Sequence, residues 1–128
     1  MGRDTKYGEM MLRKLKPFFI QNSIIPRIFS KFAPIEIWAI TIFPFVFCRG
    51  ELGESTKRHE TIHFQQQIET GIIFFYLIYL WDYLRLRRKG LAGLLAYRQI
   101  RAEKEAHEKD NDPYYLEERE RFRWLRGN

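Results

Sequence analysis

The sequence has a single cysteine, Cys48, so it cannot form a disulfide within the chain. This excludes a small secreted scaffold held together by disulfides, and a reducing compartment such as the cytoplasm is expected. The opening MGRDTKYGEMMLRKLK lacks the apolar stretch of a secretory signal, and internal repeats and low-complexity tracts are missing. At 128 residues, we expect one domain over residues 1–128, with residues 1–16 as a flexible basic N-terminus.

No apolar run approaches the roughly 20 residues that a membrane-spanning helix needs. Ile72–Trp81 is about half that length and is apolar on every side of a helix. Each side of such a helix needs cover. A buried central helix is the first expectation, and contact with another copy of the chain or dipping into a membrane surface are the alternatives.

The chain carries 22 Lys and Arg against 16 Asp and Glu, a net charge of +6. The basic residues cluster at Arg3–Lys16 and at Arg85–Lys89, which suits an anionic surface. No helix-turn-helix, zinc-finger spacing or aromatic sheet motif is present, so nucleic acid is not the expected partner. The basic run RLRRK follows the apolar segment directly, and residues Ile72–Lys89 together fit a membrane surface better.

The segment Ile35–Cys48 is rich in β-branched and aromatic residues and predicts short strands, with Pro44 at an edge, a bulge or a break. A helical pattern, capped by Ser55 or Thr56, begins near Lys57 and meets no breaker before Gly90 except Gly71. A straight helix over 57–88 would be about 48 Å long, which is too long for a compact domain. We therefore expect a bend near Gly71 or near residues 82–90.

After Gly90 the helical pattern resumes, with an interruption around Gln99–Ala102 and an end at Asn111–Pro113. A last amphipathic segment, YYLEERERFRWL, closes the chain. The expected fold class is therefore mainly α with a small β element.

His59, Glu60 and His63 spell the motif H-E-x-x-H on the predicted helix. Residues four apart share a helix face, so both imidazoles can meet one metal ion. Zn²⁺ is the metal that this motif indicates. The carboxylate of Glu60 can then take a proton from a water held by the metal, as a general base does.

A catalytic zinc needs a third protein ligand and an open position. The stretch AEKEAHEKD supplies His107 and three glutamates, Glu103, Glu105 and Glu108. Glu103 and Glu105 are two residues apart, so at most one of them faces the metal. Antiparallel pairing of this helix with the motif helix requires a turn near residue 83, which favours a bend around Trp81–Leu86.

Three segments resemble a family: RHETIHFQQQIE, FFYLIYLWDYL and AYRQIRAEKEAHEKDNDPYYLEERERFRW. They are similar to short bacterial and phage-encoded proteins of the zincin type, whose pattern is HExxHxxQQ, an apolar helix, AYRNIxFExEAYxNE and a closing YL…R…F. The similarity covers about residues 34–125, and the family is labelled as metallopeptidases. It implies a zincin-like active-site helix paired with a downstream helix that carries a glutamate.

The resemblance also implies roles for particular residues. The family's Glu-Ala pair resembles the Glu-Ala-Asp element of membrane-associated zinc endopeptidases, in which the glutamate before the alanine is the ligand. This resemblance selects Glu105 to join His59 and His63, with Glu60 as general base. Three positions depart from the family pattern. His107 replaces a tyrosine, Asp110 replaces a glutamate, and Arg101 replaces the small residue that would cap the last helix.

Other polar residues near the motif are candidates for supporting roles. Gln66 and Gln67 follow His63 by three and four residues and could hold a ligand or a water by hydrogen bonds. A hydrolase also needs a donor that stabilises the transition state. The candidates for it are Tyr76, Tyr97, Arg98 and His107.

The sequence thus predicts a zinc metallopeptidase that acts on a peptide or protein. Two alternatives stay open. The first is a non-catalytic protein, for example in a virion, in which His59, His63, Glu105 and His107 enclose a structural zinc and the apolar helix contacts an assembly partner or a second copy. The second is a membrane-surface adaptor that works through Ile72–Lys89.

Overall fold

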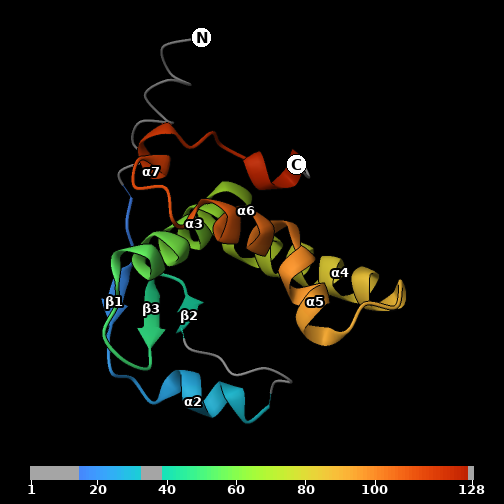
Figure 1. Cartoon of the computed structure of the whole chain (residues 1–128), viewed down its shortest axis with the longest axis horizontal. Helices are drawn as coiled ribbons and strands as arrows, with labels where there is room; N and C mark the ends of the chain where they lie inside the picture. Colours follow the sequence, from blue (N-terminus) through green and yellow to red (C-terminus); the bar gives the residue numbers. More distant parts are fainter. Residues whose placement is uncertain (1–14, 33–38, 127–128) are drawn as a thin grey trace.

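The computed structural model of the chain describes residues 15–32 and 39–126 (Figure 1). These residues are mostly helical with a small three-stranded sheet, which confirms the predicted class of mainly α with a β element. Most of the predicted basic N-terminus, residues 1–14, lies outside the described residues, as do residues 35–38 of the predicted strand segment.

The described strands form one sheet with the order β1-β3-β2. Strand β2 (Ala39–Ile42) runs antiparallel to β3 (Phe45–Cys48), and the two are joined by a turn with a cis Phe43–Pro44 bond. Of the edge, bulge or break predicted at Pro44, the structure has the break between two short strands. Strand β1 (Phe18–Ile20), which was not predicted, pairs in parallel with β3, so β2 is left at one edge of the sheet. A short helix, α2 (Ile25–Ser30), lies between β1 and β2 in the chain.

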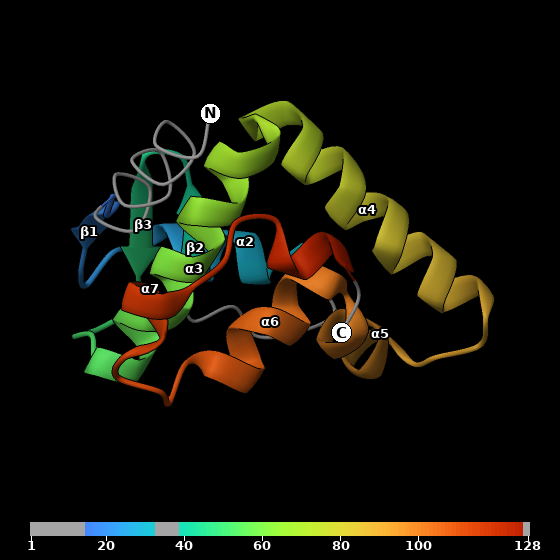
Figure 2. The same cartoon turned by 90° about the horizontal axis from the view of Figure 1, so that it is seen from above.

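The long helical pattern divides at Gly71 into α3 (Glu54–Thr70) and α4 (Ile72–Arg88). Gly71 has a φ of +77°, which other residues adopt only with strain. The two helices form a V with this glycine at its apex (Figure 2). The prediction of a bend around Trp81–Leu86 was wrong, because the reversal at Gly71 already returns the chain and α4 continues unbroken to Arg88.

Helices α5 (Gly93–Gln99) and α6 (Arg101–Lys109) are separated at Ile100, as the pattern predicted. The start of α6 has no cap from its own sequence. Asp82 of α4 supplies one: its Oδ2 accepts the backbone N–H of Arg101 at 3.2 Å and the Nε–H of the same residue at 2.9 Å. A tertiary contact therefore replaces the missing local cap.

The end of the chain folds back over α3 and α6. It contains α7 (Tyr115–Glu118) and a short 3₁₀ helix, η1 (Arg123–Arg126). Between them, Arg119 is buried and reaches two helices: its Nη1 lies 2.8 Å from Glu69 Oε2 on α3, and its Nε lies 2.8 Å from Glu105 Oε2 on α6. This buried pairing joins the C-terminal segment to both helices.

The largest apolar core lies between α4, α5, α6 and η1, and its buried members are Phe75, Leu86, Ala96, Ile100, Ala102 and Trp124. The expectation that Ile72–Trp81 is a buried helix was wrong, because Phe75 is its one buried residue and the others are half-buried or exposed. Within the described ranges, no helix is long and apolar enough to cross a membrane.

We expect replacement of Arg119 by Ala to destabilise the fold by about 3 to 5 kcal/mol, because Glu69 and Glu105 would keep buried negative charges without their partner. Urea denaturation followed by circular dichroism measures this loss. The matched control is Arg126→Ala, which removes an ion pair to Glu120 whose two side chains are each 61% exposed. It should cost less than about 1 kcal/mol. Equal losses of stability in the two variants would contradict the proposed role of Arg119 in joining the C-terminal segment to α3 and α6.

Candidate metal centre

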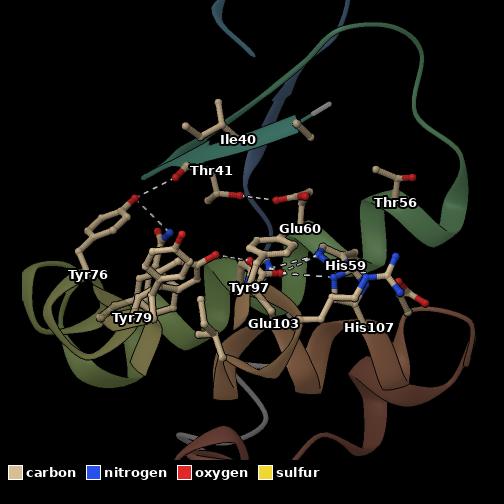
Figure 3. Close-up of a pocket in the computed structure, with 18 of the residues that line it drawn as sticks. Ile40, Thr41, Thr56, His59, Glu60, Tyr76, Tyr79, Tyr97, Glu103 and His107 are labelled. Carbon is tan, nitrogen blue, oxygen red and sulfur yellow. Dashed lines mark hydrogen bonds and ion pairs between the residues drawn. The ribbon is translucent and has the colours of Figure 1, made fainter. Parts of the chain in front are cut away.

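Helices α3 and α6 pack side by side and bring three polar side chains to one point (Figure 3). The Nε2 atoms of His59 and His63 lie 3.2 Å apart. Glu103 Oε1 lies 2.9 Å from Nε2 of His63 and 3.4 Å from Nε2 of His59. His63 and Glu103 are buried and His59 is nearly so, which removes these groups from bulk water.

The other nitrogen of each imidazole is held by an acceptor. His59 Nδ1 lies 3.1 Å from Asp110 Oδ2. His63 Nδ1 lies 2.9 Å from Gln66 Oε1. The amide of Gln66 can face only one way, because its Nε2 donates to Ala102 O at 3.0 Å and to Glu105 Oε1 at 2.9 Å. Both Nδ1 atoms must therefore be the protonated donors.

This arrangement fixes what the other side of each ring can do. A neutral imidazole with a proton on Nδ1 has a lone pair on Nε2. Two such lone pairs and the Glu103 carboxylate oxygen then face one another at contact distance, in a largely buried place. They repel unless a cation lies among them. A proton on His63 Nε2 or a metal ion can fill that role.

The charges of the cluster agree with this view. Burial lowers the pKa of His63, but the Glu103 carboxylate outweighs it and raises the pKa to about 9. Burial also opposes the ionisation of Glu103, yet the two imidazoles hold its pKa well below the usual range. The cluster therefore attracts one positive charge strongly.

The residues fit zinc in type and spacing. Tetrahedral zinc with bonds of about 2.0 to 2.1 Å places its ligand atoms about 3.3 Å apart, and the three measured separations lie on either side of that value. His107 Nε2 lies 3.8 Å from Glu103 Oε1, and the His107 and His59 rings are 4.7 Å apart. The ligand atoms of His59, Glu103 and His107 all lie within 4.8 Å of one another, so His107 is a possible fourth group.

Glu105, which the family resemblance selected, does not face the histidines. Its carboxylate accepts hydrogen bonds from Arg119, from Gln66 and from the hydroxyl of Tyr115. Glu103 takes the expected position instead. Both glutamates reach α3, but at different places. Glu103, like His107 four residues later, faces the histidines, whereas Glu105 is two residues from Glu103 and points toward Gln66 and Arg119.

Glu60 lies on the β2 side of the cluster (Figure 3). Its Oε2 accepts the Thr41 hydroxyl at 2.6 Å. Both residues line a cleft of about 930 Å³ that also contains His59, His63, Glu103 and His107. The cluster thus forms part of the wall of a large cleft, with a carboxylate beside it.

The remaining predicted residues are divided between the cleft and the scaffold. Tyr97 and Arg98 line the cleft, and burial together with the adjacent Glu103 raises the pKa of Tyr97. The Tyr76 hydroxyl donates to Thr41 O at 2.8 Å. Gln67 Nε2 donates to that same hydroxyl at 3.3 Å, so Gln67 supports β2 and not a metal ligand.

Three contributors were not predicted in their present roles. Glu103 was among the candidate ligands, but the sequence did not separate it from Glu105. Asp110 appeared only as a departure from the family pattern, and nothing local marks it as the partner of His59. Tyr79, whose hydroxyl donates to Glu103 Oε2 at 2.7 Å, lies in the apolar run and carries no sequence signal of this role.

Comparison of the chain with protein-family models, with curated proteins and with solved structures gave no match. The resemblance to short HExxH proteins therefore stays a prediction from the motifs. The geometry of the cluster has to carry the functional argument by itself.

Replacement of Glu103 by Gln should abolish zinc binding, because it removes a buried charged ligand. Glu105→Gln is the matched control, since it makes the same chemical change two residues away. It should keep about one zinc per chain even if the fold is less stable. Elemental analysis of the purified variants measures both. Loss of zinc in Glu105→Gln with full zinc in Glu103→Gln would restore the family-based assignment.

Zinc binding should release about one proton at pH 7, because zinc displaces the proton that His63 holds below its pKa of about 9. Calorimetry in buffers of different ionisation enthalpy measures the release, which should fade as the pH rises past 9. Without metal, this raised pKa stabilises the fold below about pH 6.5, and the gain is lost as the pH rises through 9. A release that does not change with pH would contradict this assignment.

Proposed function

We propose that this protein is a zinc-dependent hydrolase, with peptide bonds as its substrate class. The observation that carries the proposal is the convergence of His59 Nε2, His63 Nε2 and Glu103 Oε1 in the wall of an open cleft, with Glu60 beside them. The motif resemblance supports the same chemistry.

The three converging atoms are the proposed zinc ligands. Bound zinc would supply a Lewis acid and would lower the pKa of a water molecule toward neutrality. Asp110 and Gln66 hold the two imidazoles with Nε2 toward the ligand position, and Tyr79 holds the second oxygen of Glu103. These outer contacts fix the ligands before any metal binds.

Glu60 is the proposed general base. The Thr41 hydroxyl holds one carboxylate oxygen of Glu60, which leaves the other oxygen to accept a proton. Glu60 would take this proton from the attacking water and return it to the leaving amine. Glu60 lies on α3 with His59 and His63, but its carboxylate is held by Thr41 of β2, a strand that carries no proposed ligand.

The cleft suits an extended chain. Ala39, Ile40 and Thr41 of β2 line it, and β2 is an edge strand of the sheet among the described residues. An extended peptide could pair with such an edge through its backbone. Tyr97, Arg98 and His107 line the same cleft and are the candidates for stabilising the transition state.

The position of His107 favours one alternative function. If His107 joins His59, His63 and Glu103 as a fourth ligand, the zinc would be enclosed and would only stabilise the fold. Two observations favour the hydrolase: the His107 side chain is 40% exposed at the cleft, and Glu60 lines the same cleft beside the cluster.

The test is to incubate the zinc-loaded protein with a complex mixture of peptides and to identify new termini by mass spectrometry. Wild type should cut, and Glu60→Gln should lose about a hundredfold or more of the rate while keeping its zinc, because glutamine can still accept the Thr41 hydroxyl but cannot act as a base. Full activity in Glu60→Gln would contradict the proposed base.

His107→Ala separates the two functions. A hydrolase with three ligands should keep its zinc in this variant, whereas an enclosed structural site should lose zinc and melt at a lower temperature. If wild type cuts no peptide and His107→Ala loses its zinc, the structural alternative holds and the hydrolase is wrong.

A further inference from the structure

The outer side of α4 is apolar over most of its length. Its residues are spaced by one, three or four positions, so they share one side of the helix. We name this set the α4 apolar face; it consists of Ile73, Phe74, Leu77, Leu80, Trp81 and Leu84. Exposure ranges from 51% for Leu84 to 74% for Ile73. A continuous apolar surface of this kind marks an interaction site.

The exposed charged residues of α4 are all basic. Asp82 is the one acidic residue of α4; it is buried and binds Arg101, so it does not reach the outer side. The last turn carries Arg85, Arg87 and Arg88, with Lys89 after it. Arg87, Arg88 and Lys89 are exposed and the Arg85 side chain is 41% exposed. The apolar face therefore ends in a basic group, in which Arg85 lies 3.8 Å from the buried Asp82 and the exposed Arg87, Arg88 and Lys89 keep their charge toward solvent.

We infer that the α4 apolar face docks on a lipid bilayer that contains anionic headgroups, with α4 lying along the surface. A helix with a wide apolar side and adjacent arginines binds in this way, and a tryptophan such as Trp81 suits the boundary between headgroups and acyl chains. Basic residues near such a surface are attracted by its negative potential. Spanning is not required, since none of the helices in the described ranges is long and apolar enough to cross a bilayer.

A second copy of the chain fits this face less well. Two copies paired in antiparallel fashion along α4 would place the arginines of one helix near Ile72 and Ile73 of the other. No acid lies on the outer side of α4 to pair with them. Anionic lipid supplies both the apolar cover and the opposite charge, so charge complementarity decides for the membrane.

The inner side of the same helix belongs to the cleft. Phe75, Tyr79 and Tyr83 line it, on a different side of α4 from the apolar face. Docking through α4 would therefore hold the cleft close to the bilayer. The inference does not depend on the proposed hydrolysis, because it concerns the opposite side of the helix.

Vesicle flotation tests the inference. The full chain should float with vesicles of phosphatidylcholine containing about 30% phosphatidylserine and bind phosphatidylcholine alone more weakly. The double variant Leu77→Glu with Leu80→Glu should reduce binding to anionic vesicles by about tenfold or more. Arg87→Glu with Arg88→Glu should remove the preference for anionic lipid. The matched control is Ile24→Glu with Ile28→Glu, two exposed residues 68% and 45% accessible near α2, which should bind like wild type.

A second measurement does not depend on the folding of these variants. In a Trp38→Phe background, brominated lipid should quench tryptophan fluorescence, and adding Trp81→Phe should remove most of this quenching, since the remaining Trp124 is buried. No flotation of wild type, or flotation unchanged by the leucine variant, would overturn the inference. A dimer in sedimentation that the leucine variant dissociates, without vesicle binding, would assign the face to a second copy instead.

Discussion

The side-chain amide of Gln66 is the contact on which both the cluster and the helix pairing depend. It accepts from His63, donates to the backbone of Ala102 and donates to the Glu105 carboxylate. One group of α3 thereby fixes the orientation of a proposed ligand and joins α3 to α6. Because all of these groups are buried, a change that leaves any of them unpaired would cost stability as well as site geometry.

Two of the three glutamates of α6, Glu103 and Glu105, have different roles because their carboxylates are buried beside different partners. Glu103 faces the histidines, while Glu105 faces Arg119 and the amide of Gln66. A carboxylate buried among lone pairs requires a cation, and one buried beside a guanidinium already has one. The cluster therefore attracts a metal ion or a proton where Glu103 lies, and the Glu105 pairing serves to hold the C-terminal segment against α3 and α6.

Helix α4 connects the two proposals made for this protein. Its inner side gives Tyr79 to Glu103 and lines the cleft, whereas its outer side carries the α4 apolar face. Gly71 makes this two-sided role of α4 possible. The chain changes direction there, so α4 diverges from α3 (Figure 2), and the outer side of α4 stays exposed. A hydrolase with its cleft beside a bilayer would act on peptide segments close to the membrane surface.

Local pattern alone determined the helix with His59, Glu60 and His63, the short strands around Pro44 and the pause before α6, since each depends on residues a few positions apart. The same periodicity showed that at most one of Glu103 and Glu105 faces the histidines, but not which one. Only the tertiary structure decided that Asp82 caps α6, that Asp110 holds His59 and that Ile72–Trp81 faces outward. These features depend on contacts between residues far apart in the chain, and they arise only when Gly71 and the buried Arg119 bring distant segments together.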